Sequence, residues 1–162
     1  MAVIEGEAGI GKSRLIEEVV RRATGSGFVV LTGAAQELEA ERPFGLIRDA
    51  LLTSSIGHVP AMAELDELTR LLRSPASTRL DPSAHAPDAR FQAVDAVAEA
   101  VEQVARRNPL LLVLDDLHWS DPSSLLAIAR LTRSIEALPV ALVCSTRVPP
   151  RAVEVDHALT AM

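Results

Sequence analysis

Residues 6 to 13 combine glycines, a lysine and a serine at the spacing G-x-x-x-x-G-K-S, which suits them to bind phosphate groups. Glycines let the backbone curl so that its N–H groups point inward at phosphate oxygens. Lys12 adds a mobile positive charge for the β- and γ-phosphates, and the hydroxyl of Ser13 is a ligand for magnesium. We therefore predict that the chain binds ATP with Mg²⁺. The predicted nucleotide-binding residues are Gly6, Glu7, Ala8, Gly9, Ile10, Gly11, Lys12, Ser13 and Arg14.

Lys12 is the only lysine of the chain, which has 16 Lys and Arg residues in total. Lysine carries a compact ammonium group on a flexible stem, whereas arginine carries a planar fork. A sequence that uses arginine for every other cation therefore favours a functional role for this lysine. The alternative is a chance match in an ordinary turn, and the strand expected before the loop and the helix expected after it argue against that.

Two adjacent carboxylates, Asp115 and Asp116, follow the apolar run from Leu110 to Leu114. Acidic side chains beside a buried strand are costly unless they face a cation, water or a proton to be moved. Ligands of open parallel sheets bind at the carboxyl ends of the strands, so we expect the pair beside residues 6–13. Asp115 is the predicted magnesium-side residue, and Asp116 is predicted to orient or deprotonate the attacking water. An Asp pair that only caps the next helix is the alternative.

A third candidate segment, Ser145-Thr146-Arg147, ends the last expected strand. If that strand lies between the strands that carry the other two motifs, Arg147 is placed to sense the γ-phosphate. A surface arginine at a strand end is the alternative. His118 follows the acidic pair closely, and packing or capping is expected of it rather than catalysis. The predicted catalytic residues are Lys12, Asp116 and Arg147.

Short apolar runs alternate with longer amphipathic ones along the chain. Strands are expected at residues 1–4, 28–31, 110–114 and 139–145, and an exposed loop at 74–87. Helices are expected at 12–23, 46–52 and 61–72, from a cap at Asp88 with Phe91 on its apolar face, and from Asp121-Pro122 to residue 131. This order predicts an α/β fold of the P-loop NTPase type, in three layers with a parallel sheet and helices on both faces.

The composition indicates one domain with an aliphatic core, since 48% of the 162 residues are apolar and only 2% are aromatic. The net charge of −6 and the lack of a basic stripe argue against direct contact with nucleic acid. No signal peptide is evident, and the longest aliphatic run is too short to span a bilayer, so we expect a cytoplasmic protein without a membrane partner. The single cysteine, Cys144, excludes an internal disulfide and is expected to be an inert core thiol.

The series GEAGIGKSRL, RPFGLIRDALL, LLLVLDDLHWSDPSSL and PVALVCSTR resembles the AAA-type ATPase domain of signal-transduction NTPases, the STAND group. It is most similar to the domain of large LuxR-type and MalT-like transcriptional regulators, and the resemblance runs from Ala2 to about Arg147. The resemblance implies ATP binding, slow hydrolysis and a switch between resting and homo-oligomeric active states. It also implies that Asp115 and Asp116 are the magnesium and catalytic acids and that Arg147 ends the sensor strand.

Compared with that family, the chain is expected to be truncated at both ends and its sheet incomplete. Residues 1–147 are expected to form the NTPase core, and residues 148–162 a short tail that begins a further region. We expect weak, poorly base-selective binding and very slow turnover from this chain alone. Two alternatives stay open. The first is a non-hydrolysing remnant or scaffold of such a regulator. The second, a small-molecule P-loop kinase, is less favoured, because the Asp pair and the sensor strand favour water as the acceptor.

Overall fold

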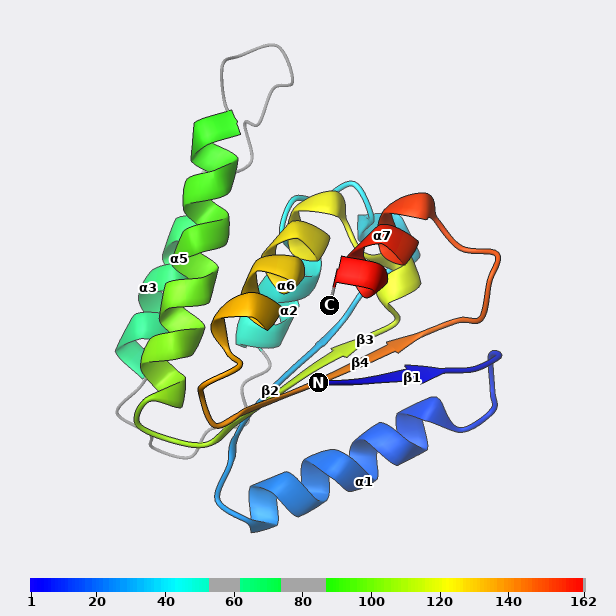
Figure 1. The fold of residues 1–162 in the computed structure, drawn as a ribbon, viewed down its shortest axis with the longest axis horizontal. Helices are drawn as coiled ribbons and strands as arrows, with labels where there is room; N and C mark the ends of the chain where they lie inside the picture. The colour runs from blue at the N-terminus through cyan, green and yellow to red at the C-terminus, as the bar shows by residue number, and fades with distance from the viewer. Residues whose placement is uncertain (53–61, 74–86, 162) are drawn as a thin grey trace.

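The computed structural model describes residues 1–52, 62–73 and 87–161 (Figure 1). Residues 74–86 of the expected loop therefore lie outside the described residues. No helix in the described part of the chain is long and apolar enough to cross a membrane. The elements are β1 (Ala2–Glu5), α1 (Lys12–Gly25), β2 (Val29–Ala34), the 3₁₀ turn η1 (Glu37–Glu39), α2 (Gly45–Leu52), α3 (Met62–Arg73), α5 (Pro87–Ala105), β3 (Leu110–Asp115), the 3₁₀ turn η2 (Leu117–Trp119), α6 (Pro122–Ser134), β4 (Val140–Thr146) and α7 (Val153–Ala161).

The four strands form one parallel sheet in the order β1-β4-β3-β2. β4 thus lies between β1 and β3, which is the condition that the sequence analysis set for a sensor role of Arg147. Glu5 of β1 is in register with Thr146 of β4, and Leu114 of β3 with Cys144. The carboxyl ends of all three strands therefore meet at one edge of the sheet.

Helices cover both faces of the sheet, which confirms the predicted three-layer α/β fold. α1 lies alone below the sheet in Figure 1, whereas α2, α6 and α7 lie above it. α5 packs against α6, and α3 packs against α5 on the outer side. The described part of the chain therefore places one helical layer against each face of the sheet, the pattern expected of parallel strands joined by helical crossovers.

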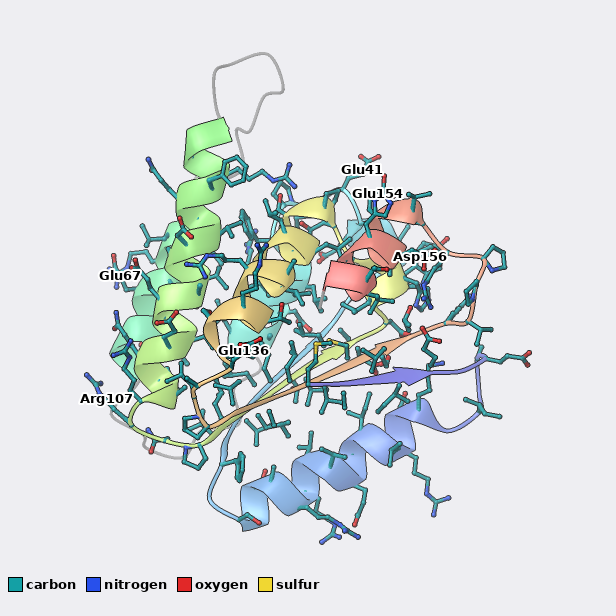
Figure 2. All side chains as sticks on the ribbon, viewed as in Figure 1. Glu41, Glu67, Arg107, Glu136, Glu154 and Asp156 are labelled. Atoms are coloured by element: carbon teal, nitrogen blue, oxygen red, sulfur yellow. The ribbon has the colours of Figure 1, made fainter. Side chains whose placement is uncertain are left out.

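Alternate residues of the central strand β3 fill two separate cores. Leu110, Leu112 and Leu114 belong to the large core under α2, α5 and α6, whereas Leu111 and Val113 pack with Ile16 of α1. Figure 2 shows aliphatic side chains filling the space between the sheet and the helices. A strand that is buried on both faces must be apolar at every position, which explains its unbroken aliphatic run.

Cys144 of β4 lies in the large core and has no exposed surface. Burial raises the pKa of its thiol to about 12, so the sulfur stays protonated and unreactive at neutral pH. The expectation of an inert core thiol is confirmed.

Three details of the sequence analysis need correction. α5 begins at Pro87, so Asp88 lies inside its first turn and not at its cap, because the fixed φ of proline favours the first helical position. Phe91 is 54% exposed, because the N-terminal part of α5 projects past α6 (Figure 1). Residues 153–161 form α7, where no element was predicted, and its Val155 and Ala158 are buried in the large core.

Gly33 of β2 allows the backbone of α2 to approach the sheet closely. A Cβ atom at this position would lie 2.6 Å from the carbonyl oxygen of Leu46 and 2.8 Å from the amide nitrogen of Ala50. Neither backbone atom can move without shifting the helix. We therefore expect Gly33→Ala to lower the free energy of unfolding by about 1–3 kcal/mol, the usual cost of overpacking, as measured by urea denaturation.

Gly25→Ala is the matched control, because a Cβ at Gly25 meets no atom within 4 Å. Both substitutions reduce the freedom of the unfolded chain, and only the one at Gly33 introduces a close contact, so a loss of stability confined to Gly33→Ala reports the approach of α2. Equal stabilities of the two variants would contradict the close approach of α2 to β2.

Candidate functional site

The segment from Gly6 to Ser13, which we call the glycine loop, connects the carboxyl end of β1 to the first turn of α1. Gly9 and Gly11 have φ angles of 78° and 106°, in the left-handed region that other residues enter only with strain. The N–H of Gly6 donates to the carbonyl of Thr146 at 3.3 Å, which fixes the start of the loop to the end of β4. Sequence and backbone geometry thus agree on a tight loop at the strand edge.

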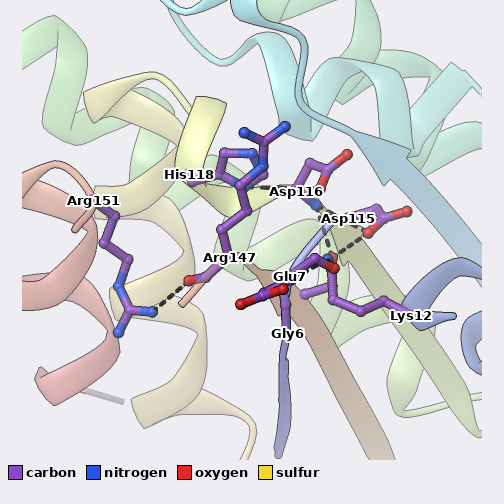
Figure 3. A network of polar contacts seen from close by, with 9 residues as sticks. Gly6, Glu7, Lys12, Asp115, Asp116, His118, Arg147 and Arg151 are labelled. Carbon is purple, nitrogen blue, oxygen red and sulfur yellow. Dashed lines mark hydrogen bonds and ion pairs between the residues drawn. The ribbon is translucent and has the colours of Figure 1, made fainter. Parts of the chain in front are cut away.

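Lys12 folds back over the glycine loop. Its Nζ donates to the carbonyl oxygens of Gly6 and Glu7 at 2.9 and 3.0 Å (Figure 3). Two of the three ammonium protons are therefore used within the loop and one is left over. The side chain is only partly buried, so its charge is held at the mouth of the loop and not inside the core.

The N-terminus of α1 faces the glycine loop without any acid to neutralise it. Its capping residue is Gly11, which has no side chain, and the first turn contains no Asp or Glu. The first N–H groups of a helix lack intrahelical partners and carry a partial positive charge. This end of α1 is consequently suited to an anion. The neighbouring Ile10, Ser13 and Arg14 are exposed to solvent.

Asp115 and Asp116 emerge at the same edge, beside Lys12 and Gly6 (Figure 3). The carboxylate of Asp115 accepts hydrogen bonds from the hydroxyl of Ser145 and, at 3.0 Å, from the N–H of Asp116. These donors hold one oxygen of Asp115 in place. Ser145 is fully buried in β4, so a neighbouring strand sets the orientation of this carboxylate.

Asp116 turns the chain out of β3 into the 3₁₀ turn. Its φ of 56° is left-handed, a conformation that Asp tolerates better than most residues. Its side chain is 44% exposed and makes no capping hydrogen bond to the turn that follows. The side chain of Asp116 therefore does not act as a helix cap, the alternative role considered for the acidic pair.

His118, Trp119 and Arg147 lie together next to the acidic pair, with the two rings tilted by 45° to each other. The rings of His118 and Trp119 lie 5.0 Å apart, and Cζ of Arg147 lies 5.7 Å from the centroid of the Trp119 ring. The guanidinium of Arg147 points towards His118 and away from Lys12 (Figure 3). Arg147 thus starts from the expected strand end, while its charged group rests on an aromatic ring at cation–π distance.

His118 is a packing residue in this arrangement. Its side chain is 6% exposed, and neither ring nitrogen has a hydrogen-bond partner among the described residues. Its Nδ1 lies 3.8 Å from Oδ1 of Asp116. Burial lowers the pKa of His118, and the charge of Asp116 offsets this only in part, so the ring is neutral at pH 7. The packing role expected from the sequence agrees with this position.

Asp121 has a structural role that the sequence analysis did not predict. It caps α6, as Oδ1 accepts from the N–H groups of Ser123 and Ser124 at 3.0 and 2.9 Å. The same carboxylate accepts from Phe44 at 2.8 Å and from Gly45 at 3.0 Å, at the start of α2. Only the cap of α6 was visible in the sequence, because Phe44 and Asp121 are 77 positions apart. Asp121 therefore joins the start of α2 to the start of α6.

Comparison with known proteins agrees with this geometry. A family model of the AAA ATPase domain matches residues 1–143. A protein of Rhizobium meliloti (strain 1021), described as uncharacterized, is 30% identical over 168 residues, which cover 91% of this chain and 16% of that protein. The chain thus spans 16% of the length of this relative. No solved structure matches the chain significantly.

Proposed function

Since this chain belongs to the family of AAA ATPase domains, we propose that it is the ATP-binding switch module of a signal-transduction or transcriptional regulator, and that it hydrolyses ATP slowly. The single observation that carries the proposal is the meeting of the glycine loop, Lys12 and the acidic pair at one sheet edge (Figure 3). The family supports a nucleotide-binding ATPase-type module. The choice of ATP, the slow turnover and the regulatory role are our inference.

The phosphate groups are proposed to bind between the glycine loop and the first turn of α1. The segment from Gly6 to Arg14 surrounds this position. Its backbone N–H groups, other than those of Gly6 and Ile10 that bond within the protein, are the proposed donors, and Lys12 supplies the positive charge. The carbonyl bonds of Lys12 already hold its Nζ against the loop, so little side-chain entropy remains to be lost on binding. The first turn of α1 contains no acidic residue, and this absence of negative charge supports the binding of an anion by these donors.

Magnesium fits the oxygen ligands that the site offers. The hydroxyl of Ser13 is exposed, and the carboxylate of Asp115 is half-buried with Ser145 fixing one of its oxygens. Hard divalent cations prefer such oxygen ligands, often through water. A bound magnesium ion supplies positive charge that offsets the negative charge of the phosphates.

Hydrolysis requires a group that orients water and accepts its proton. Asp116 is the proposed base, because its carboxylate is exposed beside Asp115 and is free of capping bonds. It takes the proton of the attacking water as the water oxygen bonds to the γ-phosphorus, and the bond to the ADP oxygen breaks. Arg147 is proposed to sense the γ-phosphate, which requires its guanidinium to leave the Trp119 ring.

The regulatory role follows from the resemblance to STAND-type regulators and from the much greater length of the relative. We propose a cytoplasmic protein whose activity involves a homo-oligomer, with residues 1–147 as its NTPase core and α7 packed against that core. A non-hydrolysing scaffold is the second candidate, because Arg147 rests on Trp119 instead of facing the glycine loop. An assay of phosphate release from ATP, with and without metabolite acceptors, separates these two functions from a kinase.

We expect Asp116→Asn to lower phosphate release by about 10²–10⁴-fold, the usual contribution of a general base, with ATP affinity retained. Asp115→Asn is expected instead to weaken the magnesium dependence of ATP binding, because it removes the charge beside the proposed cation. Phosphate release under single-turnover conditions and ATP titrations with and without magnesium measure the two effects.

Asp95→Asn is the control, since Asp95 is an exposed acid that pairs with Arg130 on the far helices. It removes the same charge and is expected to change neither quantity. Full turnover by Asp116→Asn would refute the role of base that we give to Asp116.

A further inference from the structure

Arg151 is a largely covered arginine whose guanidinium binds three separate parts of the chain. Its side chain is only 9% exposed. Nε donates to Asp156 of α7 at 2.5 Å, and Nη1 donates to Glu5 of β1 at 2.8 Å and to the carbonyl of Arg147 at 2.9 Å. Figure 3 shows the bond between Arg151 and the backbone of Arg147. The planar fork of arginine suits it to hold several acceptors in fixed directions.

Two of these acceptors lie at the edge of the proposed site. Glu5 is the last residue of β1 and directly precedes Gly6 of the glycine loop. Arg147 directly follows β4, and its carbonyl is fixed while its side chain rests on Trp119. One guanidinium therefore holds the strand end that begins the glycine loop and the backbone of the arginine proposed as sensor.

The third acceptor belongs to α7, a helix outside the four-stranded sheet. Asp156 lies between Val155 and Ala158, which pack in the large core beside α6. A displacement of α7 changes the position of Asp156 and so the position in which Arg151 holds its other two partners. The acids are half-exposed, with 43% of the Glu5 side chain and 46% of the Asp156 side chain accessible, so these bonds open without unfolding the core.

We propose that Arg151 is a positioning residue, which makes the orientation of Arg147 depend on the placement of α7. The effect of this positioning on nucleotide affinity rests on the proposed function. A shift of α7 changes the affinity of the site for ATP relative to ADP. By linkage the coupling is reciprocal, so the γ-phosphate also changes the placement of α7.

Trp119 gives a direct readout, because it is the only tryptophan and the chain has no tyrosine. A cation over the indole changes its emission, and Arg147→Gln defines the signal of the uncovered ring. Without nucleotide, Arg151→Gln is expected to shift the emission towards that of Arg147→Gln. Asp156→Asn is expected to shift it in the same direction, and this milder variant decides the matter if Arg151→Gln does not fold.

Arg130→Gln is the matched control, because it also removes one charge and one ion pair between two elements, here α5 and α6. It is expected to leave the emission of Trp119 unchanged. Wild-type emission from both Arg151→Gln and Asp156→Asn in folded protein would overturn the proposal.

A second measurement compares ATP and ADP affinity by competition. We expect Arg151→Gln to reduce the preference for ATP by about 5-fold or more, the lower range of allosteric coupling, with ADP affinity nearly unchanged. A general loss of structure would weaken both nucleotides alike and would contradict the positioning role. If the wild-type chain binds neither nucleotide, the proposed function is wrong, while the emission comparison still decides the role of Arg151.

Discussion

Replacement of Asp121 by alanine is expected to lower the free energy of unfolding by about 3–5 kcal/mol, because several buried N–H groups lose a charged acceptor. The carboxylate is 2% exposed and accepts four backbone hydrogen bonds, two at the start of α6 and two at Phe44 and Gly45. Phe44 has a left-handed φ of 58°, so its bond to Asp121 also holds a strained residue in place. Urea denaturation followed by circular dichroism measures the loss.

Asp121→Asn is the informative comparison. Oδ1 accepts three of the four bonds, and an amide oxygen replaces it without a change of shape. The amide nitrogen would face the N–H of Gly45 in place of Oδ2, so one bond is lost. We therefore expect the asparagine variant to lie between the wild type and the alanine variant in stability. An alanine variant as stable as the asparagine variant would contradict the double capping.

Lys12→Ala is expected to weaken ATP binding by about 10–100-fold, since the one ammonium proton left free by the loop carbonyls can make a charge-assisted hydrogen bond that contributes about 1.5–3 kcal/mol. The fold should survive, because Nζ contacts only the carbonyls of Gly6 and Glu7 at the mouth of the loop. No other lysine exists in the chain to take over its charge. Titration with a fluorescent ATP analogue measures the affinity, and thermal unfolding verifies the fold.

Arg21→Ala serves as the control for the loss of one positive charge from the same helix. Arg21 is exposed and pairs with Glu18, well along α1 from the glycine loop. Its removal is expected to leave the affinity unchanged. If Lys12→Ala binds the analogue as tightly as Arg21→Ala does, the phosphate groups are not held by this lysine.

Local patterns were sufficient to predict the strands, most helices and the glycine loop. The loop is specified by residues that are adjacent in sequence, and the aliphatic run before Asp115 marks a strand buried on both faces. The neighbours of β4 were not predictable in this way. A sensor role for Arg147 depended on β4 lying between β1 and β3, and only the strand order of the folded sheet shows that it does.

The interactions that the sequence analysis missed join residues far apart in the chain. Arg151 and Glu5 are 146 positions apart, and Ser145 and Asp115 are 30 apart. No periodicity or spacing encodes such pairs, because their partners are chosen by the packing of elements. The stack of Arg147 on Trp119 is similar, since the rotamer of an arginine at a strand end depends on its neighbours in space.

The central claim is that the glycine loop binds the triphosphate of ATP, and calorimetric titration of the unmodified chain tests it most directly. We predict saturable binding of Mg-ATP with one site per chain, and no binding of adenosine over the same concentration range, because the contacts of the loop are to phosphate groups. Binding of adenosine as tight as that of Mg-ATP, or no saturable heat with Mg-ATP at millimolar concentration, would contradict the account.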